Sequence, residues 1–302
     1  MRTGHRYGRS TGLTLRMAFV MLLLVLVYLA FVTVLFALRV NIVFIAVFVA
    51  GTALVQYFFS DKLVLASMGA HDVSPEQAPE LHGLIDRLCQ LIDLPKPRVA
   101  IADLDVPNAF ATGRNPKHAV VCCTTGIMRR LDTNELEAVL AHELSHVKNR
   151  DVAIITWASI FSTIASFIVQ WGFWLGLGGG GGRRDRNNNG GAVILIYFAS
   201  VVVWIASFFL IRALSRYREL AADRGSAIIT GAPSHLMSAL VKISGTIARI
   251  PTQDLRRVES QNAFMIVPAI NGNSLAGLFS THPSLETRLE QLRQLQRQME
   301  GT

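Results

Sequence analysis

Long apolar segments without charged residues constrain the fold of this sequence more than any other feature. A helix needs ~20 apolar residues to cross the hydrocarbon core of a bilayer. Four segments satisfy this requirement: residues 17–38, 40–59, 152–177 and 192–211. A single run of this kind could be a buried helix of a soluble protein, and the second pair could be a hairpin partly sheltered by protein. Four such runs, in a chain of 302 residues that is 51% hydrophobic, predict four transmembrane helices.

The basic residues predict how the chain crosses the membrane, because Lys and Arg are enriched in the short cytoplasmic flanks of transmembrane helices. Four of them precede the first apolar segment: Arg2, Arg6, Arg9 and Arg16. In contrast, Arg39 alone separates the first segment from the second. This asymmetry predicts a cytoplasmic N-terminus and, after two crossings, a cytoplasmic polar region. The Gly- and Asn-rich loop at 178–191 places three arginines on the opposite side, which weighs against this orientation without reversing it.

The composition excludes several other classes of protein. The formal net charge is +8, but many of the basic residues flank apolar segments, so we assign the charge to membrane topology and expect no nucleic-acid partner. The three cysteines are odd in number and include an adjacent pair: Cys89, Cys122 and Cys123. They predict no disulfide framework, which fits a reducing compartment.

The apolar segments divide the chain into four parts. Residues 1–60 form an N-terminal tail and a transmembrane hairpin. Residues 61–151 form the first part of a cytoplasmic domain, and 152–211 form a second hairpin around the Gly- and Asn-rich loop. Residues 212–302 complete the cytoplasmic domain. The expected fold class is therefore membrane α+β, with four transmembrane helices.

The first polar part has the patterns of a mainly helical domain with a small β-sheet. Apolar residues at helical spacing predict a helix that begins at Pro79 and ends before Pro95. Three strand-like runs follow: residues 98–102, 108–112 and 119–123. A second helix is expected to begin at Asp132, because Asp132 and Glu135 have the spacing of a capping box. This helix should continue without a break into the third apolar segment.

The motif His142-Glu143-Leu144-Ser145-His146 has metal-binding spacing and falls on this second helix. Side chains at i and i+4 lie on one face of a helix, so the two imidazoles can hold one Zn²⁺. Glu143 can then take a proton from water that the ion activates and pass it to the leaving amine of a peptide. Two histidines at this spacing also arise by chance as solvated side chains. Their place on a capped, amphipathic helix favours a metal site.

Catalytic zinc typically has three protein ligands, so a third ligand is expected elsewhere in the chain. Glu219 and Asp223 share a helix face at i and i+4. We expect Glu219 to bind the metal and Asp223 to fix the tautomer of a ligand imidazole by accepting its hydrogen bond. The alternative is a solvated acidic face that pairs with nearby arginines. Two apolar segments separate His142 from Glu219, which places both residues on the same side of the membrane.

Four groups of residues carry a family resemblance: His142-Glu-Leu-Ser-His146 with Asp151, Glu219-Leu-Ala-Ala-Asp223, Asn108-Ala-Phe-Ala-Thr-Gly113, and Ser280-Thr-His-Pro283 with Arg288. In order and spacing, over nearly the whole chain, they resemble the HtpX family of membrane metalloproteases, within the group that includes the CAAX prenyl proteases. The resemblance implies a zincin-like, zinc-dependent endopeptidase of the cytoplasmic (inner) membrane. It also implies quality control of damaged membrane proteins, often linked to stress. Ser284 departs from the family pattern, which usually has a second proline there.

The strand at Asn108, Ala109, Phe110 and Ala111 has two interpretations. It reads as a short strand that ends in a turn, and it could form an edge beside the metal. A protease can bind an extended substrate along such an edge through main-chain hydrogen bonds. An internal strand of the sheet is the alternative, and the sequence alone does not separate the two.

His282 and Arg288 also have two interpretations each. His282 precedes Pro283, where a helix is expected to begin. It could donate a hydrogen bond to the oxyanion of the tetrahedral intermediate, or it could be a capping or core histidine. Arg288 could assist it or pair with a structural acid. The resemblance favours a functional role for His282, and we place Asp151 with Asp223 as a candidate partner of the metal ligands.

Other functions compete with proteolysis. A membrane-bound chaperone or binding module would hold structural zinc, but such a site needs no base, whereas Glu143 is present. A signalling receptor would need a sizeable outer domain, and the predicted outer segments are short. A CAAX-type protease has the same chemistry but usually more spans. The expected partners are the lipid bilayer and misfolded or damaged membrane proteins, while oligomeric state and cleavage preference do not follow from the sequence.

Overall fold

The computed structural model describes residues 11–37, 64–172, 190–250, 265–267 and 280–301, with isolated positions between 43 and 62. The helices are α1 (Thr11–Ala37), α3 (Pro79–Ile92), α4 (Thr125–Arg130), α5 (Thr133–Asn149), α6 (Asp151–Gly172), α7 (Gly190–Thr230), α8 (Pro233–Ile247) and α10 (Leu285–Glu300). The strands are β1 (Ala70–Asp72), β2 (Arg98–Ala102), β3 (Ala109–Thr112) and β4 (Val120–Thr124), with a short 3-10 helix η1 (Pro116–His118). The described chain is therefore mostly helical with one small sheet, as expected.

Three helical stretches are long and apolar enough to cross a membrane. They are Thr11–Ala37, Asp151–Gln170 and Ile194–Thr230. These correspond to the first, third and fourth predicted segments. The second predicted segment, at 40–59, lies outside the described residues apart from isolated positions. The protein therefore has the long apolar helices of a membrane protein, and the described part of the chain contains three of the four predicted.

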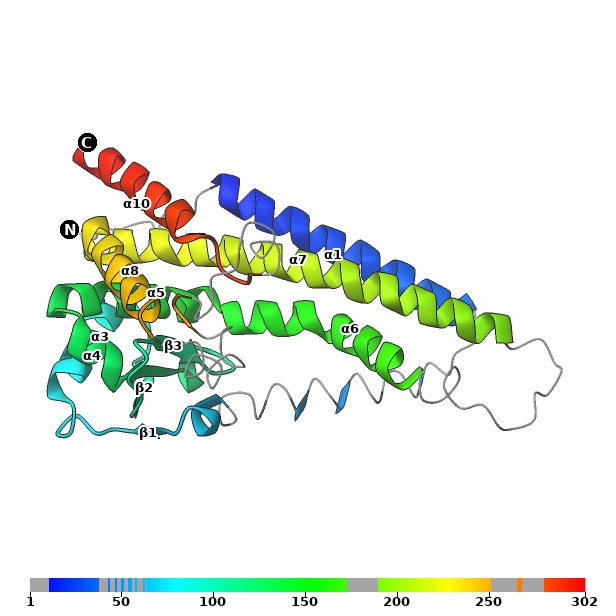
Figure 1. Cartoon of the computed structure of the whole chain (residues 1–302), viewed down its shortest axis with the longest axis horizontal. Coiled ribbons are helices and arrows are strands. Elements are labelled where there is room, and N and C mark those ends of the chain that lie inside the picture. The colour runs from blue at the N-terminus through cyan, green and yellow to red at the C-terminus, as the bar shows by residue number, and fades with distance from the viewer. Residues whose placement is uncertain are drawn as a thin grey trace.

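Helices α1, α6 and α7 lie side by side and extend together away from the polar part of the protein (Figure 1). Their common core is apolar and includes Phe31 of α1, Ile164 of α6 and Leu214 of α7. The Tyr28 hydroxyl donates a buried hydrogen bond to the Ala158 carbonyl at 2.6 Å. Without such a partner, the hydroxyl would be costly to bury among apolar side chains.

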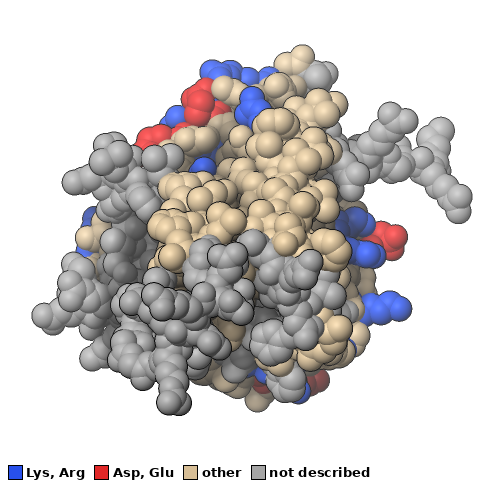
Figure 2. Space-filling model, turned by 90° about the vertical axis from the view of Figure 1, so that its right-hand side faces the viewer, with Lys and Arg blue, Asp and Glu red and all other residues tan. Residues whose placement is uncertain are grey.

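The outer surface of these helices is also apolar. Phe19, Phe36 and Trp157 are at least 60% exposed, although each is a large hydrophobic residue. Figure 2, seen from the end to which these helices extend, shows uncharged side chains over the described surface and charged ones toward its rim. Apolar patches of this size are unfavourable in water but suited to lipid tails. The surface therefore supports the assignment of these helices to a membrane.

Helix α7 joins the apolar bundle to the polar domain. It runs for 41 residues without a break, a length of about 60 Å. In Figure 1 it extends along α1 and α6 and then continues between α5, α8 and α10. The helix crosses the boundary predicted at 211/212, so one rigid element carries residues of both parts. The division into four parts stays a prediction.

The four strands form one mixed sheet in the order β1-β2-β4-β3. β2 and β4 are parallel, and the two outer strands are antiparallel to their neighbours. One face, with Val99 and Val121, packs against α3 and α5 in the main core. The other face, with Phe110 and Cys122, packs against Met68. The three predicted strands are present within one residue of their predicted bounds, and β3 is an outer strand next to α5.

Helix α5 begins as its sequence predicts. The Asp132 side chain accepts a hydrogen bond from the Glu135 amide at 3.0 Å, and the Glu135 side chain accepts one from the Asp132 amide at 3.0 Å. This reciprocal pair is a complete capping box. It fixes the first turn of the helix and therefore the direction in which the metal-binding motif is presented.

The prediction that this helix continues into the third apolar segment is wrong. Arg150 has a φ of 57°, and its amide donates back to the carbonyls of His146 and Val147. A left-handed residue of this kind ends a helix, although glycine usually occupies the position. α6 therefore starts as a new helix at Asp151. The break matters for function because it brings the Asp151 carboxylate back to a histidine of the preceding helix.

Candidate metal centre

Two helices bring together the three predicted metal ligands. His142 and His146 lie on successive turns of α5, and Glu219 lies on α7. The two Nε2 atoms are 3.2 Å apart. Glu219 Oε1 lies 3.3 Å from His146 Nε2, and its Oε2 lies 3.5 Å from His142 Nε2. Among the described residues, these three are the group whose donor atoms converge closely enough to hold a metal ion.

Each imidazole has a carboxylate behind it. Asp223 Oδ1 lies 2.9 Å from His142 Nδ1, and Asp151 Oδ2 lies 2.6 Å from His146 Nδ1. These acceptors favour a proton on Nδ1, so that in the neutral ring, the form that binds a metal ion, the Nε2 lone pair is on the side of Glu219. Asp223 is fully buried and Glu219 is 7% exposed. The alternative of a solvated acidic face is therefore excluded.

Two arginines compensate the buried carboxylates. Arg288 of α10 binds both oxygens of Asp223, with Nε to Oδ2 at 2.8 Å and Nη2 to Oδ1 at 2.6 Å. Arg218 Nε lies 3.2 Å from Asp151 Oδ1. Arg288 also donates to the Ile266 carbonyl at 2.6 Å. Of the two interpretations of Arg288, the geometry supports pairing with a structural acid, because both of its bonds to Asp223 are made inside the core.

The surrounding carboxylates change the proton affinity of the imidazoles. Burial is the largest influence on the pKa of His146 and lowers it, but Glu219 and Asp151 together outweigh burial and raise the pKa to about 10. Burial also opposes protonation of His142, yet Asp223 and Glu219 raise its pKa above the usual value. Without a metal ion, protonation of both rings is therefore favoured over that of a free imidazole, most of all at His146. A metal ion has to displace these protons, because it binds the neutral imidazole.

Glu143 contacts the edge strand of the sheet. Its Oε2 accepts a hydrogen bond from the amide of Ala111 in β3 at 2.9 Å. Burial raises the pKa of the Glu143 carboxyl group. A raised pKa brings a carboxyl group closer to the range in which it exchanges protons at neutral pH. The candidate base and the candidate substrate strand are therefore in direct contact.

His282 lies at the same centre. It is 6% exposed, and its Nδ1 lies 3.1 Å from Glu219 Oε2. Ser280 fixes the local turn, since its hydroxyl donates to the His282 carbonyl at 2.9 Å and accepts from the His282 amide at 3.2 Å. His282 Nε2 is buried and has no hydrogen-bond partner among the described residues. A buried ring nitrogen in this condition is suited to a polar group of a ligand.

The four candidate substrate-binding residues have different surroundings. Asn108 uses its side-chain oxygen to accept the amide of Ile266 at 3.0 Å, which anchors a distant segment beside the sheet. Phe110 is buried on the sheet face that is opposite to α5. Ala109 and Ala111 lie on the face toward α5. Only part of this strand is thus placed toward the metal ligands.

Sequence reasoning missed two contacts of this centre. Arg218 is one of the arginines near Glu219 that the solvated-face alternative pairs with acidic residues, whereas in the structure it pairs with buried Asp151. A signal was available, because a buried carboxylate beside a metal ligand needs a compensating cation. The contact between Glu143 and the Ala111 amide had no such signal. It involves a backbone group, and it depends on how the sheet packs on α5.

Comparisons with known proteins identify the family. The sequence profile of "Peptidase family M48" matches residues 75–296, which include the metal-binding motif and Glu219. The chain is 62% identical over 293 residues to "Protease HtpX homolog" of Moorella thermoacetica, covering 97% of both chains. It is 55% identical over 295 residues to "Protease HtpX homolog 2" of Methanosarcina acetivorans, covering 97% of this chain and 99% of that one.

A solved structure supports the fold. The crystal structure of S. mikatae Ste24p superposes with a TM-score of 0.55 and 17% sequence identity, covering 88% of this chain and 62% of that chain. At this identity the likeness concerns the fold alone. Three findings lead to the same assignment. They are the family match, the relatives that match over nearly their full length, and the apolar helices joined to a His-His-Glu cluster. The chain belongs to peptidase family M48 and is a membrane metalloprotease.

Proposed function

We propose that the metal is zinc and that the chain is a zinc-dependent endopeptidase. In a tetrahedral site with zinc–ligand bonds of ~2.0–2.1 Å, neighbouring ligand atoms lie ~3.3 Å apart. The separations among the donor atoms of His142, His146 and Glu219 are 3.2, 3.3 and 3.5 Å. This convergence of two buried imidazoles and one carboxylate carries the proposal. Three protein ligands are also the number typical of catalytic rather than structural zinc.

The neighbouring residues take acid–base and positioning roles in this proposal. When bound, zinc supplies a Lewis acid that polarises the attacking water and the scissile carbonyl. Glu143 accepts the proton of the water and donates it to the leaving amine. His282 donates a hydrogen bond from its unpaired Nε2 to the oxyanion. Asp223, with Arg288 behind it, and Asp151 hold the two imidazoles in the tautomer that binds the ion.

The outer edge of β3 binds the substrate main chain in this proposal. Hydrogen bonds alternate along an antiparallel pair. The amide of Thr124 donates to the Asn108 carbonyl at 2.9 Å, so Asn108 and Phe110 direct their main-chain groups at β4. Ala109 and Ala111 consequently direct theirs outward. The Ala111 amide donates to Glu143, and the other outward groups, both main-chain groups of Ala109 and the Ala111 carbonyl, are where an extended peptide can add as a further strand. Main-chain recognition of this kind suits a protease that accepts many sequences.

The connection of the metal centre to the membrane supports a class of substrates. Glu219 and Asp223 lie on the helix that also provides an apolar span, and Asp151 begins another. We therefore propose that the enzyme acts at the cytoplasmic face of the inner membrane on misfolded or damaged membrane proteins, in quality control or a stress response. The excess of arginine before the first span supports this orientation.

The test compares the full-length protein with two variants after purification in detergent with chelator and reloading with zinc. Glu143→Gln should keep zinc but lower the cleavage of casein and of an unfolded membrane protein at least ~100-fold, because the base is lost. Glu219→Ala should lose zinc. Asp86→Asn, which removes a half-exposed carboxylate on α3, serves as the control. Full activity of Glu143→Gln would overturn the mechanism, and unchanged zinc content in Glu219→Ala would remove it as a ligand.

A further inference from the structure

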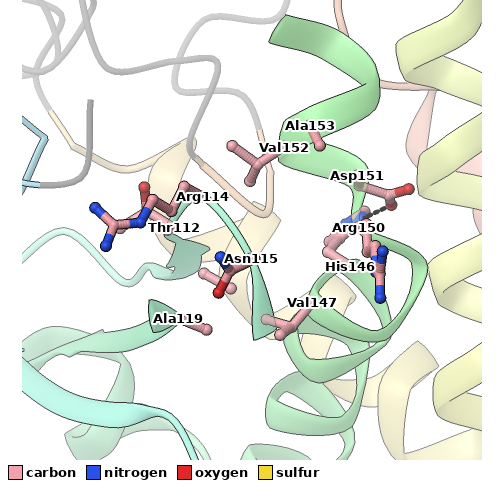
Figure 3. Close-up of a pocket in the computed structure, with 12 residues that line it drawn as sticks. Thr112, Arg114, Asn115, Ala119, His146, Val147, Arg150, Asp151, Val152 and Ala153 are labelled. Carbon is pink, nitrogen blue, oxygen red and sulfur yellow. Dashed lines mark hydrogen bonds and ion pairs between the residues drawn. The ribbon is translucent and has the colours of Figure 1, made fainter. Parts of the chain in front are cut away.

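A pocket lies beside the metal ligands, between the end of β3 and the junction of α5 with α6 (Figure 3). The sheet side contributes Ala111, Gly113 and Ala119, and the helix side contributes Val147, Val152 and Ala153. His146, a candidate metal ligand, also lines it. The pocket therefore adjoins the candidate metal site at His146 and is placed to receive a side chain of a bound peptide.

Two backbone features create this pocket. Gly113 has a φ of 122°, and a Cβ at this position would collide with the His118 carbonyl oxygen. The turn after β3 therefore packs directly on the following segment and brings Ala119 into the wall. On the other side, the left-handed residue Arg150 changes the chain direction between α5 and α6. The corner formed by the two helices provides Val147 and Val152.

Two polar side chains of the lining, Asn115 and Asp151, already have partners. Asn115 Oδ1 accepts the amides of Lys117 at 3.1 Å and His118 at 3.2 Å. The Asp151 carboxylate binds His146 and Arg218. Figure 3 shows the guanidinium of Arg114 directed away from the other labelled residues. A polar side chain placed in the pocket would lose its hydrogen bonds to water without gaining new ones from Asn115, Asp151 or Arg114, which is unfavourable. An aliphatic side chain has no hydrogen bonds to lose.

The contact between Glu143 and β3 sets the direction of the substrate. Because the Ala111 amide holds the Glu143 carboxylate, the scissile bond has to lie beside Ala111. A peptide that adds antiparallel to β3 then places the residues before its scissile bond next to Thr112 and the turn that follows. The pocket begins at this point, so it faces the amino-terminal side of the scissile bond.

We propose that this pocket is a specificity site for a small aliphatic side chain, alanine or valine, on the substrate residue before the scissile bond. Val152 and Val147 limit its size from the helices, and Ala119 limits it from the sheet. The proposal rests on the proposed proteolytic function. It adds a preference to an enzyme whose main-chain recognition is otherwise indifferent to sequence.

A series of peptides tests the preference. The peptides differ only at the residue before the scissile bond, which is glycine, alanine, valine, phenylalanine or glutamate. The zinc-loaded full-length protein should cleave the alanine and valine peptides with a kcat/KM at least ~10-fold above that of the phenylalanine and glutamate peptides. Mass spectrometry of the products locates the cleaved bond. A preference that follows the residue after the scissile bond would overturn the assigned direction.

Two variants of one residue test the pocket itself. Val152→Ala enlarges it and should raise kcat/KM for the phenylalanine peptide relative to the valine peptide ~10-fold. Val152→Phe fills it and should lower kcat/KM for the valine peptide while sparing the glycine peptide. Val241→Ala and Val241→Phe change a half-exposed valine on α8 and provide the matched control. They should leave the ratios unchanged.

The outcomes separate the two levels of the proposal. If the wild type cleaves but the Val152 variants keep the wild-type ratios, the pocket assignment is wrong and the protease remains. If neither casein nor any peptide is cleaved by the zinc-loaded wild type, the proposed function itself fails. A Val152→Phe protein that does not fold would lose the glycine peptide as well, and Val152→Ala alone would then decide.

Discussion

The two imidazoles of the metal centre depend on carboxylates that are themselves buried. Asp223 has no exposed surface, and it is held by two bonds from Arg288. A buried charge is tolerated only when it is paired and hydrogen-bonded. Arg288 holds Asp223, Asp223 is placed to orient His142, and His142 is a candidate ligand of the ion. A substitution of a residue that does not itself contact the ion should therefore still affect metal binding.

Asp223→Asn tests this dependence. The amide keeps the size of the carboxylate but loses the charge that pairs with Arg288 and stabilises the His142 imidazole. We expect zinc affinity to fall by ~10–100-fold, the usual effect of losing such a partner. Competition with a chelator of known affinity measures it. Asp86→Asn again provides the control, and an unchanged zinc affinity in Asp223→Asn would contradict the assigned role.

The raised pKa values of the imidazoles predict how metal binding depends on pH. In the metal-free protein the pKa of His146 is about 10 and that of His142 is raised above its usual value, so protons compete with a metal ion for both rings. Zinc requires the neutral ring, so binding releases protons, and affinity should fall as the pH decreases, about tenfold per pH unit for each proton displaced. Calorimetry at pH 7 in buffers with different ionisation enthalpies counts the protons. A binding enthalpy that is the same in all buffers would refute the prediction.

At the scale of elements, the break between α5 and α6 is the feature that completes the metal centre. A continuous helix would carry Asp151 onto the next turn, away from His146. The left-handed residue Arg150 turns the chain so that the carboxylate lies 2.6 Å from His146 Nδ1. An arginine in this conformation is strained, because its Cβ approaches the neighbouring carbonyl. The strain is accepted where the geometry of a ligand depends on it.

Substitutions of Arg150 separate its conformation from its charge. Glycine adopts the left-handed region without strain, so Arg150→Gly should keep zinc and increase stability by roughly 0.5–1 kcal/mol. A β-branched residue is least suited to a positive φ, so Arg150→Val should decrease stability by roughly 1–2 kcal/mol and weaken zinc binding. Thermal unfolding in detergent and zinc content measure both effects. Loss of zinc in Arg150→Gly would show that the charge, rather than the conformation, is needed.

Local patterns predicted most elements of the polar domain, and the exceptions have physical reasons. The capping pair at Asp132 and Glu135 correctly placed the start of α5, because it acts within one turn. β1 was missed, since a strand of three residues is too short to show alternation. The break at Arg150 was missed because neither glycine nor proline marks it. The parallel pairing of β2 with β4 joins segments about 20 residues apart, and no local pattern encodes it.

The candidate site was predicted more completely than the fold around it. The clustering of His142, His146, Glu219 and Asp223 could be predicted because helical spacing and ligand number are chemical requirements. The sequence did not decide whether Arg288 assists His282 or pairs with an acid, because its partner depends on how α10 packs against α7. The contact of Glu143 with Ala111 depends on the same kind of packing. Long-range packing, rather than chemistry, limited the prediction.

On the scale of the whole molecule, the candidate metal centre lies where helices that are long and apolar enough to span a membrane enter the polar domain. α6 begins at Asp151, and α7 carries both an apolar span and Glu219. The candidate ligands of one ion therefore come from elements on either side of the predicted second transmembrane hairpin. This arrangement requires the hairpin to return to the side from which it left, and the meeting of His142 with Glu219 satisfies the requirement.

Labelling of single cysteines tests on which side of the membrane the candidate metal centre lies. The three native cysteines are buried, and burial raises the pKa of Cys89 to about 11 and of Cys122 to about 12, so their thiols should react slowly. A membrane-impermeant maleimide should label Asn188→Cys, between the third and fourth predicted spans, in intact spheroplasts. It should label Glu290→Cys, on the exposed face of α10, only after permeabilisation. The reverse result would place the metal centre outside the cytoplasm. Protection of both positions until permeabilisation would show that the second hairpin does not cross the membrane.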